Sequence, residues 1–440
     1  MLAFARAAAA LPASRFSTLV LDLVDRLPPP SRDVANALAA LEPDDASPPS
    51  AAIVTAVERC RADANEGLLE GAPTVVKDTV DIAGLPTRFG RPSAVTQLAG
   101  ADAAIIGRLL RHGARIVGKT ELTELAVGGL GIDRRRGAPR NPAAPSYLTG
   151  GSSSGTASAV ADGTARFGIG GDGLGSIRIP AGCCGLVGLK PTYGVLPTAG
   201  YHSVGPSLDT LGPIARDVDD CTRLWLAMRY DRNEAALRDA RRPIEPRPPR
   251  SVGIISSLNH EHACDSVAQA VETVLEALAA ERVRLEVPGS ERATMLGASI
   301  GALELRRRCP ALETDTPEVA IAHMLGRHMG PRATSIHLAR MELQHTVDAA
   351  LERCEVIVMP TTALPAPPRR REWLRGGTSI ALLLSIARFT PLANCCGLPS
   401  IAVPVGVDER GRPLSMMFVG RRGSEIRLFE IAKAIEDIQR

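Results

Sequence analysis

Residues 149–192 read TGGSSSGTASAVADGTARFGIGGDGLGSIRIPAGCCGLVGLKPT, a stretch that contains two groups of serines and a glycine-lined turn. Upstream, Lys77 lies in the apolar run PTVVKD at residues 73–78. The intervals from Lys77 to Ser152 and from Ser152 to Ser176 are the most specific pattern in the chain. The rest of the sequence is interpreted around this lysine and these two serines.

The glycine-rich turn GGDGLGSIRIP at residues 170–180 carries Ser176. Glycine lets a backbone turn tightly and direct several N–H groups to one point, as the oxyanion of an acyl-transfer reaction requires. The preceding GIGGDG also satisfies the G-x-G-x-x-G pattern of dinucleotide sites. That pattern needs a helix directly after it and an acid about 20 residues later. Pro180 would stand in the second turn of such a helix, and KPTYGVL at residues 190–196 offers no acid, so a dinucleotide site is disfavoured.

The lysine, the two serine groups and their spacing resemble the amidase signature family, whose serine hydrolases use a Ser-Ser-Lys triad. The resemblance is strong over residues 55–230 and weaker over residues 345–420. Further similar segments are RNP at residues 140–142, CGLVGLKPTYG at 184–194, SLDTLGPI at 207–214 and NCCGLP at 394–399. The fold that this resemblance implies is a large mixed β-sheet core covered by helices on both faces.

The resemblance also implies a role for each matching residue. Ser176 would be the nucleophile, Ser152 the bridging serine after a cis peptide bond, and Lys77 the base. Ser153 would support the lysine, and Asp172 and Arg178 would orient the nucleophile turn. The oxyanion would be bound by the backbone N–H groups of Gly173, Leu174, Gly175 and Ser176.

The local sequence around Lys77 suits a base. A base must be neutral, and lowering the pKa of lysine from about 10.4 to about 7–8 requires roughly 4 kcal/mol of destabilised ammonium. Burial beside Val75 and Val76 acts in this direction. Because successive side chains of a strand face opposite sides, we expect Asp78 to point away from Lys77.

The nucleophile turn departs from the common T-D-T-G-G-S pattern of the family. Gly171 and Gly173 replace the two threonines, and Leu174 replaces the first glycine. Backbone N–H donors survive these changes, but Leu174 adds bulk and loses the freedom of glycine at positive φ. We expect a narrowed or reshaped acyl pocket, or a weakened enzyme.

Three functions follow from the resemblance. The first is hydrolysis of a small-molecule amide through an acyl-enzyme, with release of ammonia or an amine. The second is the glutaminase subunit of an amidotransferase, which would need a carboxylate clamp to which Arg340 and Arg388 could contribute. The third is a scaffold or acyl-transfer protein with a weakened site. The sequence is compatible both with a homodimer and with an amidotransferase partner subunit.

Short apolar runs and amphipathic stretches alternate along the chain. Strands are expected at residues 73–76, 114–120, 250–256, 283–287, 354–367 and 399–407, and helices at residues 102–112, 263–278 and 286–350. Strands that alternate with helices build a sheet covered on both faces, so the residues themselves also favour a mixed α/β fold.

The domain organisation is expected to be simple. Residues 1–70 should form an N-terminal helical segment packed on the core, with one helix capped near residues 16–18 and another over residues 51–69. Residues 71–440 should form a single discontinuous core. The charged, proline-rich stretch near residues 229–250 is predicted to be a linker or an excursion loop, because the strand and helix alternation resumes after it.

Composition and charge exclude several classes of protein. Of the 440 residues, 45% are hydrophobic and 22% charged, which is ordinary for a globular protein. A net charge of +3 is too weak to favour nucleic acid or an anionic membrane as a partner. No uninterrupted apolar run of about 18 residues is present, so no membrane span is expected.

The nine cysteines form no C-x-x-C pair and have no histidine at zinc-finger spacing. They are interpreted as reduced, mostly buried small residues, a usage typical of the cytoplasm. No basic region precedes the apolar N-terminal stretch, which disfavours a secretion signal. The sequence therefore predicts a cytoplasmic protein that uses no metal and no cofactor.

Overall fold

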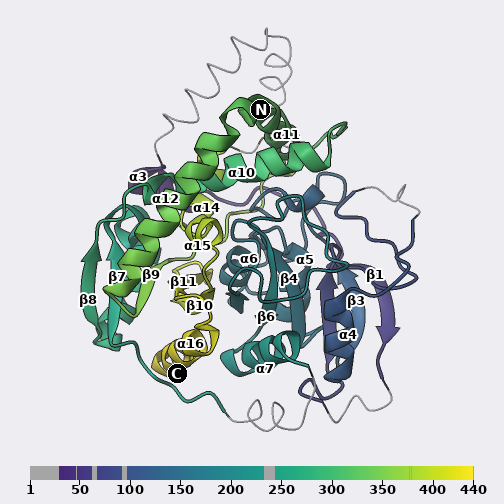
Figure 1. Ribbon diagram of the computed structural model, residues 1–440, viewed down its shortest axis with the longest axis horizontal. Coiled ribbons are helices and arrows are strands. Elements are labelled where there is room, and N and C mark those ends of the chain that lie inside the picture. The colour runs from purple at the N-terminus through teal and green to yellow at the C-terminus, as the bar shows by residue number, and fades with distance from the viewer. Residues whose placement is uncertain are drawn as a thin grey trace.

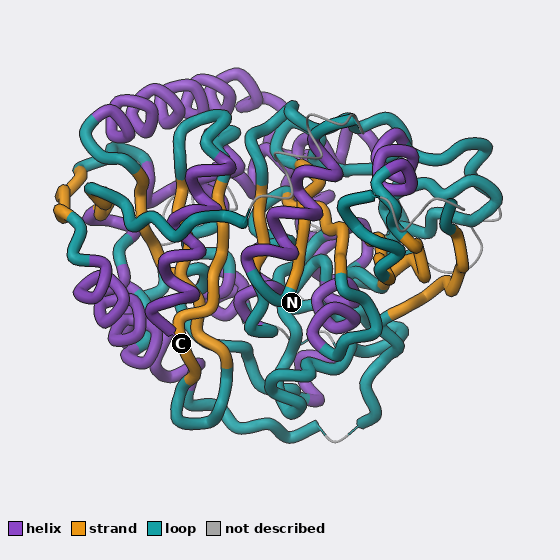
Figure 2. Tube along the Cα trace, turned by 90° about the horizontal axis from the view of Figure 1, so that it is seen from below, coloured by secondary structure: helices purple, strands orange, loops and turns teal. Residues whose placement is uncertain are grey.

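A computed structural model describes residues 29–45, 47–61, 67–91, 97–231, 243–375, 377 and 379–439. Within this part of the chain, an 11-stranded mixed sheet crosses the molecule and helices pack against it (Figures 1 and 2). This arrangement confirms the α/β fold class that the sequence predicts.

The strands coincide with short apolar runs. They are β1 (Ile53–Arg59), β2 (Pro73–Lys77), β3 (Arg115–Thr120), β4 (Phe167–Asp172), β5 (Val187–Lys190), β6 (Thr210–Ala215), β7 (Ser251–Ile255), β8 (Glu281–Leu285), β9 (Val356–Pro360), β10 (Ser400–Val407) and β11 (Pro413–Val419). Their order across the sheet is β1-β3-β2-β4-β6-β5-β10-β11-β9-β7-β8. Strand β2 runs parallel to both of its neighbours, β3 and β4, so all three end at the same edge of the sheet.

The helices form layers on the sheet and a group at one end of it. One layer consists of α5 (Ser154–Ala161) and α6 (Arg178–Cys183), and another of α4 (Ala104–Arg111), α7 (Val218–Arg229), α9 (Asp265–Leu278) and α16 (Glu425–Gln439). At one end, α10 (Ala293–Arg308), α11 (Pro317–Met329) and α12 (Ala333–Glu352) lie together near α15 (Pro391–Cys396) (Figure 1). The remaining helices are α3 (Arg32–Ala39), α13 (Arg371–Leu374) and α14 (Ile380–Ile386), with short 3-10 turns at Glu124–Ala126, Ser256–Leu258, His260–His262, Ser290–Arg292 and Gly330–Arg332.

Helix α9 illustrates how the apolar pattern positions an element. Its predicted apolar face is buried over its whole length, at Val267, Val271, Val274, Leu275 and Leu278. The helix packs against β9, β10 and β11. Since full burial of one such side chain contributes about 1.5–3 kcal/mol, this face is sufficient to fix the helix on the sheet.

The helix predicted over residues 51–69 is wrong where β1 lies. Residues Ile53–Arg59 form an edge strand that pairs antiparallel with β3, and from Thr55 onward half-buried and exposed side chains alternate. Pairing with β3 overrides the helix propensity of the alanines and the glutamate in this stretch. The helix predicted near residues 16–18 lies outside the described residues, as do residues 232–242 of the predicted linker. Residues 243–249 form neither helix nor strand.

Among the described helices, none is both long and apolar enough to cross a membrane.

Candidate active site

Three elements bring the predicted residues to one edge of the sheet. Lys77 is the last residue of β2, and Asp172 is the last residue of the parallel neighbour β4. Ser152 and Ser153 directly precede α5, which packs on β2, β3 and β4. Since parallel strands end at the same edge, residues far apart in the sequence meet here.

Lys77 is 1% exposed and makes two hydrogen bonds. Its Nζ donates to Ser152 Oγ at 2.7 Å and to the Gly171 carbonyl at 3.3 Å. Burial lowers the pKa of Lys77 to about 8, although the negative charges of Asp209 and Asp172 act in the opposite direction. The lowered pKa increases the fraction of neutral amine near physiological pH, the form that can accept a proton.

Asp78 does not neutralise the adjacent lysine. Its carboxylate forms a buried ion pair with Lys119 at 2.7 Å and accepts a hydrogen bond from the Arg88 backbone N–H. The predicted orientation of Asp78, away from Lys77, is therefore confirmed.

The serine cluster connects the lysine with the nucleophile turn. The peptide bond between Gly151 and Ser152 is cis, as the family resemblance implies. Ser153 donates its backbone N–H to the Ser176 carbonyl at 3.2 Å and its hydroxyl to the Gly171 carbonyl at 3.4 Å. That carbonyl also accepts from Lys77, so both residues share one acceptor, and the supporting role of Ser153 stays a prediction.

The nucleophile turn is folded around the carboxylate of Asp172. This buried carboxylate accepts backbone N–H groups from Gly175 at 2.7 Å and Ile177 at 3.1 Å. It also forms a two-point ion pair with Arg178, at 3.0 Å to each oxygen. Burial alone would raise the pKa of Asp172, but the charge and hydrogen bonds of Arg178 hold it well below its usual range. These charge-assisted hydrogen bonds join the carboxylate to the turn and to Arg178, and the role of the two residues in orienting the turn stays a prediction.

Two further residues of this network were assigned no role in the sequence analysis. Asn394 on α15 donates to the Asp172 carbonyl at 2.8 Å and to its Oδ1 at 2.9 Å. Thr390 donates its hydroxyl to the Leu174 carbonyl at 2.8 Å. The only available signal was the family-like segment at residues 394–399, because both contacts join positions more than 200 residues apart in the chain.

The predicted oxyanion donors are not equivalent. The N–H of Gly175 is already bound to Asp172, so it cannot also bind an oxyanion. Within the described part of the chain, the N–H groups of Gly173, Leu174 and Ser176 have no such partner. These three residues are also half-buried rather than buried.

Leu174 is accommodated without positive φ, which the turn requires instead at Gly175, where φ is 120°. The Leu174 side chain is directed toward α10, where a Cβ on Gly297 would lie only 2.5 Å from its Cδ2. The missing side chain at residue 297 therefore makes room for the extra bulk at residue 174. The effect of Leu174 on the acyl pocket stays a prediction.

The loop after the 3-10 turn at Glu124–Ala126 lies beside the serine cluster, because Gly151 donates its N–H to the Gly129 carbonyl at 2.8 Å. Next to this loop lies a cavity of about 10 Å³, and its apolar walls are formed by Val127, Leu130, Ile132, Trp373 and Leu383. In this conformation the cavity has room for about one water molecule.

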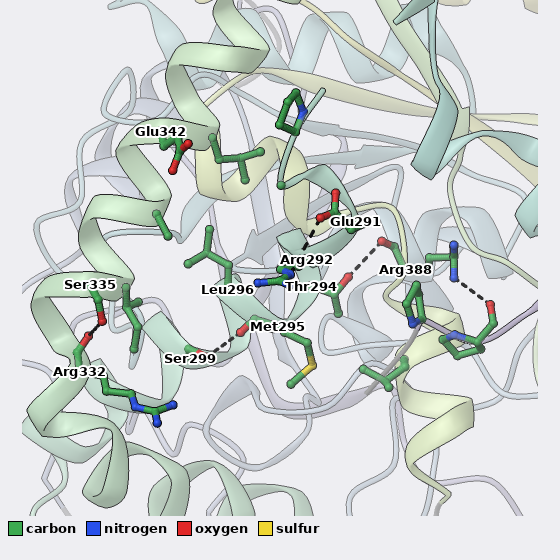
Figure 3. Close-up of a pocket in the computed structure, with 18 residues that line it drawn as sticks. Glu291, Arg292, Thr294, Met295, Leu296, Ser299, Arg332, Ser335, Glu342 and Arg388 are labelled. Carbon is green, nitrogen blue, oxygen red and sulfur yellow. Dashed lines mark hydrogen bonds and ion pairs between the residues drawn. The ribbon is translucent and has the colours of Figure 1, made fainter. Parts of the chain in front are cut away.

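The two arginines considered for a carboxylate clamp are engaged elsewhere. Arg340 donates to the Cys395 carbonyl and to the hydroxyl and carbonyl of Ser207. Arg388 donates to the Pro30 carbonyl and lines a larger cavity of about 660 Å³ between α10 and α12 (Figure 3). Neither Lys77 nor the serines of the site line that cavity.

Comparison with known proteins gives consistent matches. A family model described as Amidase matches residues 34–302 and 318–429. A glutamyl-tRNA(Gln) amidotransferase subunit from Akkermansia muciniphila is 32% identical over 395 residues, which cover 80% of this chain and 82% of that protein. A fatty acid amide hydrolase from Medicago truncatula is 30% identical over 398 residues, which cover 84% of this chain but only 65% of the longer plant enzyme.

A solved amidase structure shares the fold. It superposes with a TM-score of 0.73 at 25% identity, covering 88% of this chain and 92% of the amidase.

Proposed function

The chain belongs to the amidase signature family, and from the geometry of its site we propose that it hydrolyses a carboxamide C–N bond through a serine acyl-enzyme. The observation that carries this proposal is the 2.7 Å hydrogen bond between Lys77 Nζ and Ser152 Oγ in a buried site. A buried lysine of lowered pKa can lose its proton, and the neutral amine can then accept the proton of the adjacent serine hydroxyl.

In the proposed reaction, Ser176 Oγ attacks the amide carbonyl carbon and gives its proton to Ser152, which passes a proton to neutral Lys77. The N–H groups of Gly173, Leu174 and Ser176 stabilise the oxyanion. The proton returns through Ser152 to the leaving nitrogen, the C–N bond breaks, and ammonia or an amine departs. Water then attacks the acylated Ser176 by the same relay and releases a carboxylic acid.

The second candidate function is the glutaminase step of an amidotransferase, which the relative from Akkermansia muciniphila favours. Against it, Arg340 already donates to the hydroxyl and carbonyl of Ser207, and Arg388 to the Pro30 carbonyl. Release of ammonia from glutamine that increases when a partner protein is added would favour this second function. Release of ammonia or an amine from simple amides by the chain alone would favour the first.

We also propose that the protein acts in the cytoplasm. All nine cysteines are unpaired, whereas oxidising compartments favour disulfides.

The experiment that tests the triad is labelling of the full chain with a fluorophosphonate serine probe. We expect the wild type to react at Ser176, Ser176→Ala to be unreactive, and Lys77→Ala to react about 10²–10⁴-fold more slowly. The labelling rate should increase with pH through about 8 as Lys77 loses its proton. Ser158→Ala is the matched control, because this buried serine on α5 bonds to the Arg140 carbonyl instead.

A folded wild type that does not react with the probe would overturn the proposal, as would undiminished labelling of Ser176→Ala. Loss of labelling in Ser158→Ala as well would indicate a general loss of structure.

A further inference from the structure

Tyr201 occupies space that a side chain at residue 171 would otherwise fill. Gly171 has no Cβ, and a Cβ built there would lie 2.2 Å from the Tyr201 hydroxyl oxygen and 3.1 Å from its Cζ. The common family pattern has threonine at this position. A threonine side chain at residue 171 would therefore overlap the Tyr201 side chain.

The loop that carries Tyr201 is fixed beside the end of β2. On one side of Tyr201, the Gly200 carbonyl accepts the Asp81 N–H at 2.9 Å. On the other side, the His202 N–H donates to the Thr79 carbonyl at 2.8 Å. Residues 79–81 follow Lys77 closely in the chain, so the backbone holds Tyr201 close to the lysine.

Tyr201 also lies near a charged group that acts on Lys77. Burial raises the pKa of Tyr201, and so does the charge of Asp209, whose Cγ would lie 3.7 Å from a Cβ built on Gly173. Asp209 and Asp172 are the two acids whose charges act on Lys77, whereas Asp78 is paired with Lys119. Asp172 is already paired with Arg178. Asp209 is therefore the acid whose substitution can shift the pKa of Lys77 without breaking the ion pair of the turn.

We propose that Tyr201 is a positioning residue for Lys77, in which the tyrosine replaces the threonine side chain absent at Gly171 and holds Asp209 beside the lysine. This inference rests on the proposed role of Lys77 as the base. In this chain, Gly171 and Tyr201 together take the place of the threonine that the common family pattern has at residue 171. The pair maintains the packing around the Gly171 carbonyl, to which Lys77 donates.

The first test of this inference is a steric exchange. Gly171→Thr should lower the fluorophosphonate labelling rate at least tenfold, because the new side chain overlaps the Tyr201 hydroxyl. The double variant Gly171→Thr/Tyr201→Leu should recover the rate to within about threefold of wild type, because removal of the ring frees the space. The unfolding temperature should decrease in Gly171→Thr and recover in the double variant.

The second test is electrostatic. Asp209→Asn removes a charge that favours the ammonium form of Lys77, so the midpoint of the labelling rate against pH should move to lower pH. Tyr201→Phe should move it in the same direction by less, because Asp209 loses a polar neighbour that favours its charged form. Tyr193→Phe is the control, since its exposed hydroxyl bonds to the Pro206 carbonyl and its midpoint should not move.

A Gly171→Thr variant as reactive and stable as wild type would overturn the inference, as would a double variant no better than the single one. A midpoint unchanged in Asp209→Asn would remove the proposed influence on Lys77. If the wild type itself does not label, the proposed function fails, and the unfolding temperatures of the single and double variants still decide the steric link.

Discussion

Two buried charged groups at the ends of neighbouring strands, Asp172 on β4 and Lys77 on β2, are held in opposite ways. Asp172 is surrounded by donors from the nucleophile turn, Arg178 and Asn394, which keep it charged. Lys77 has a hydroxyl and a carbonyl as acceptors, and burial lowers its pKa to about 8. The difference separates two environments: the charge of Asp172 is paired with Arg178 and joined to the backbone of the turn, whereas Lys77, the proposed base, has no ion pair within the described residues.

The largest effect is expected when the compensated charge is removed. Asp172→Asn leaves Arg178 buried without its counter-ion, so the free energy of unfolding should decrease by about 3–5 kcal/mol. Urea denaturation measures this loss, and Asp162→Asn, an exposed residue that accepts only the nearby Thr164 N–H, is the control. An unchanged midpoint would show that Asp172 is not the anchor of the turn.

The pH dependence of the same group has a definite sign. The folded-state pKa of Asp172 lies below its unfolded value of about 3.9, so its contribution to stability is complete above that pH. The contribution decreases as the pH falls further and the carboxylate takes up a proton. The difference between wild type and Asp172→Asn should therefore narrow in acid.

Substitution of Lys77 should slow labelling strongly but leave the free energy of unfolding almost unchanged. Lys77→Met removes the proposed base, and labelling of Ser176 should slow by about 10²–10⁴-fold. The buried ammonium costs about 3 kcal/mol, since its pKa falls from 10.5 to about 8, and the two lost hydrogen bonds offset about 1–3 kcal/mol. Urea denaturation at pH 7 should thus show a stability equal to or slightly above that of wild type.

The cost of the ammonium is complete below pH 8 and disappears as the pH rises to 10.5, so any gain in Lys77→Met should fade over this interval. If Lys77→Met lost as much stability as Asp172→Asn, the buried charges of Lys77 and Asp172 would not differ in their contribution to folding.

The sequence predicted the lysine, the serines and the Asp172–Arg178 pair because these residues lie in short segments with a recognisable family spacing. Thr390 and Asn394 could not be assigned in this way, because packing of α15 brings them to the turn from more than 200 residues away. Strand β1 was mistaken for helix because its pairing with β3 is invisible in a local pattern. The occupied N–H of Gly175 depends on where the Asp172 carboxylate points, which spacing does not specify.

A smaller effect is expected at the contact between the turn and α10. Gly297→Ala places a Cβ 2.5 Å from Leu174 Cδ2, and such overpacking typically costs 1–3 kcal/mol. Because Leu174 lies two residues before Ser176 in the same turn, labelling should slow together with the loss of stability. Leu174→Ala added to Gly297→Ala should restore both. Gly301→Ala is the matched control, since a Cβ added at this position of the same helix would meet nothing within 4 Å.

The smallest effect is expected for a single hydrogen bond that tethers the turn to the segment before α15. Thr390→Val keeps the side-chain volume but leaves the Leu174 carbonyl without the hydroxyl donor now at 2.8 Å. Loss of one such bond should lower the free energy of unfolding by about 0.5–1.5 kcal/mol. Thr273→Val is the control, because among the described residues this hydroxyl bonds only to the Gln269 carbonyl of its own helix.

Thr390→Val also tests whether the nucleophile turn and Lys77 act independently. The pH midpoint of labelling should stay near 8 in Thr390→Val, because the bond touches the turn and not Lys77. The rate at every pH should decrease by a similar factor, since the N–H donors of the turn are less well fixed. A shifted midpoint would mean that the turn and the lysine are coupled, and that the two buried charges do not act separately.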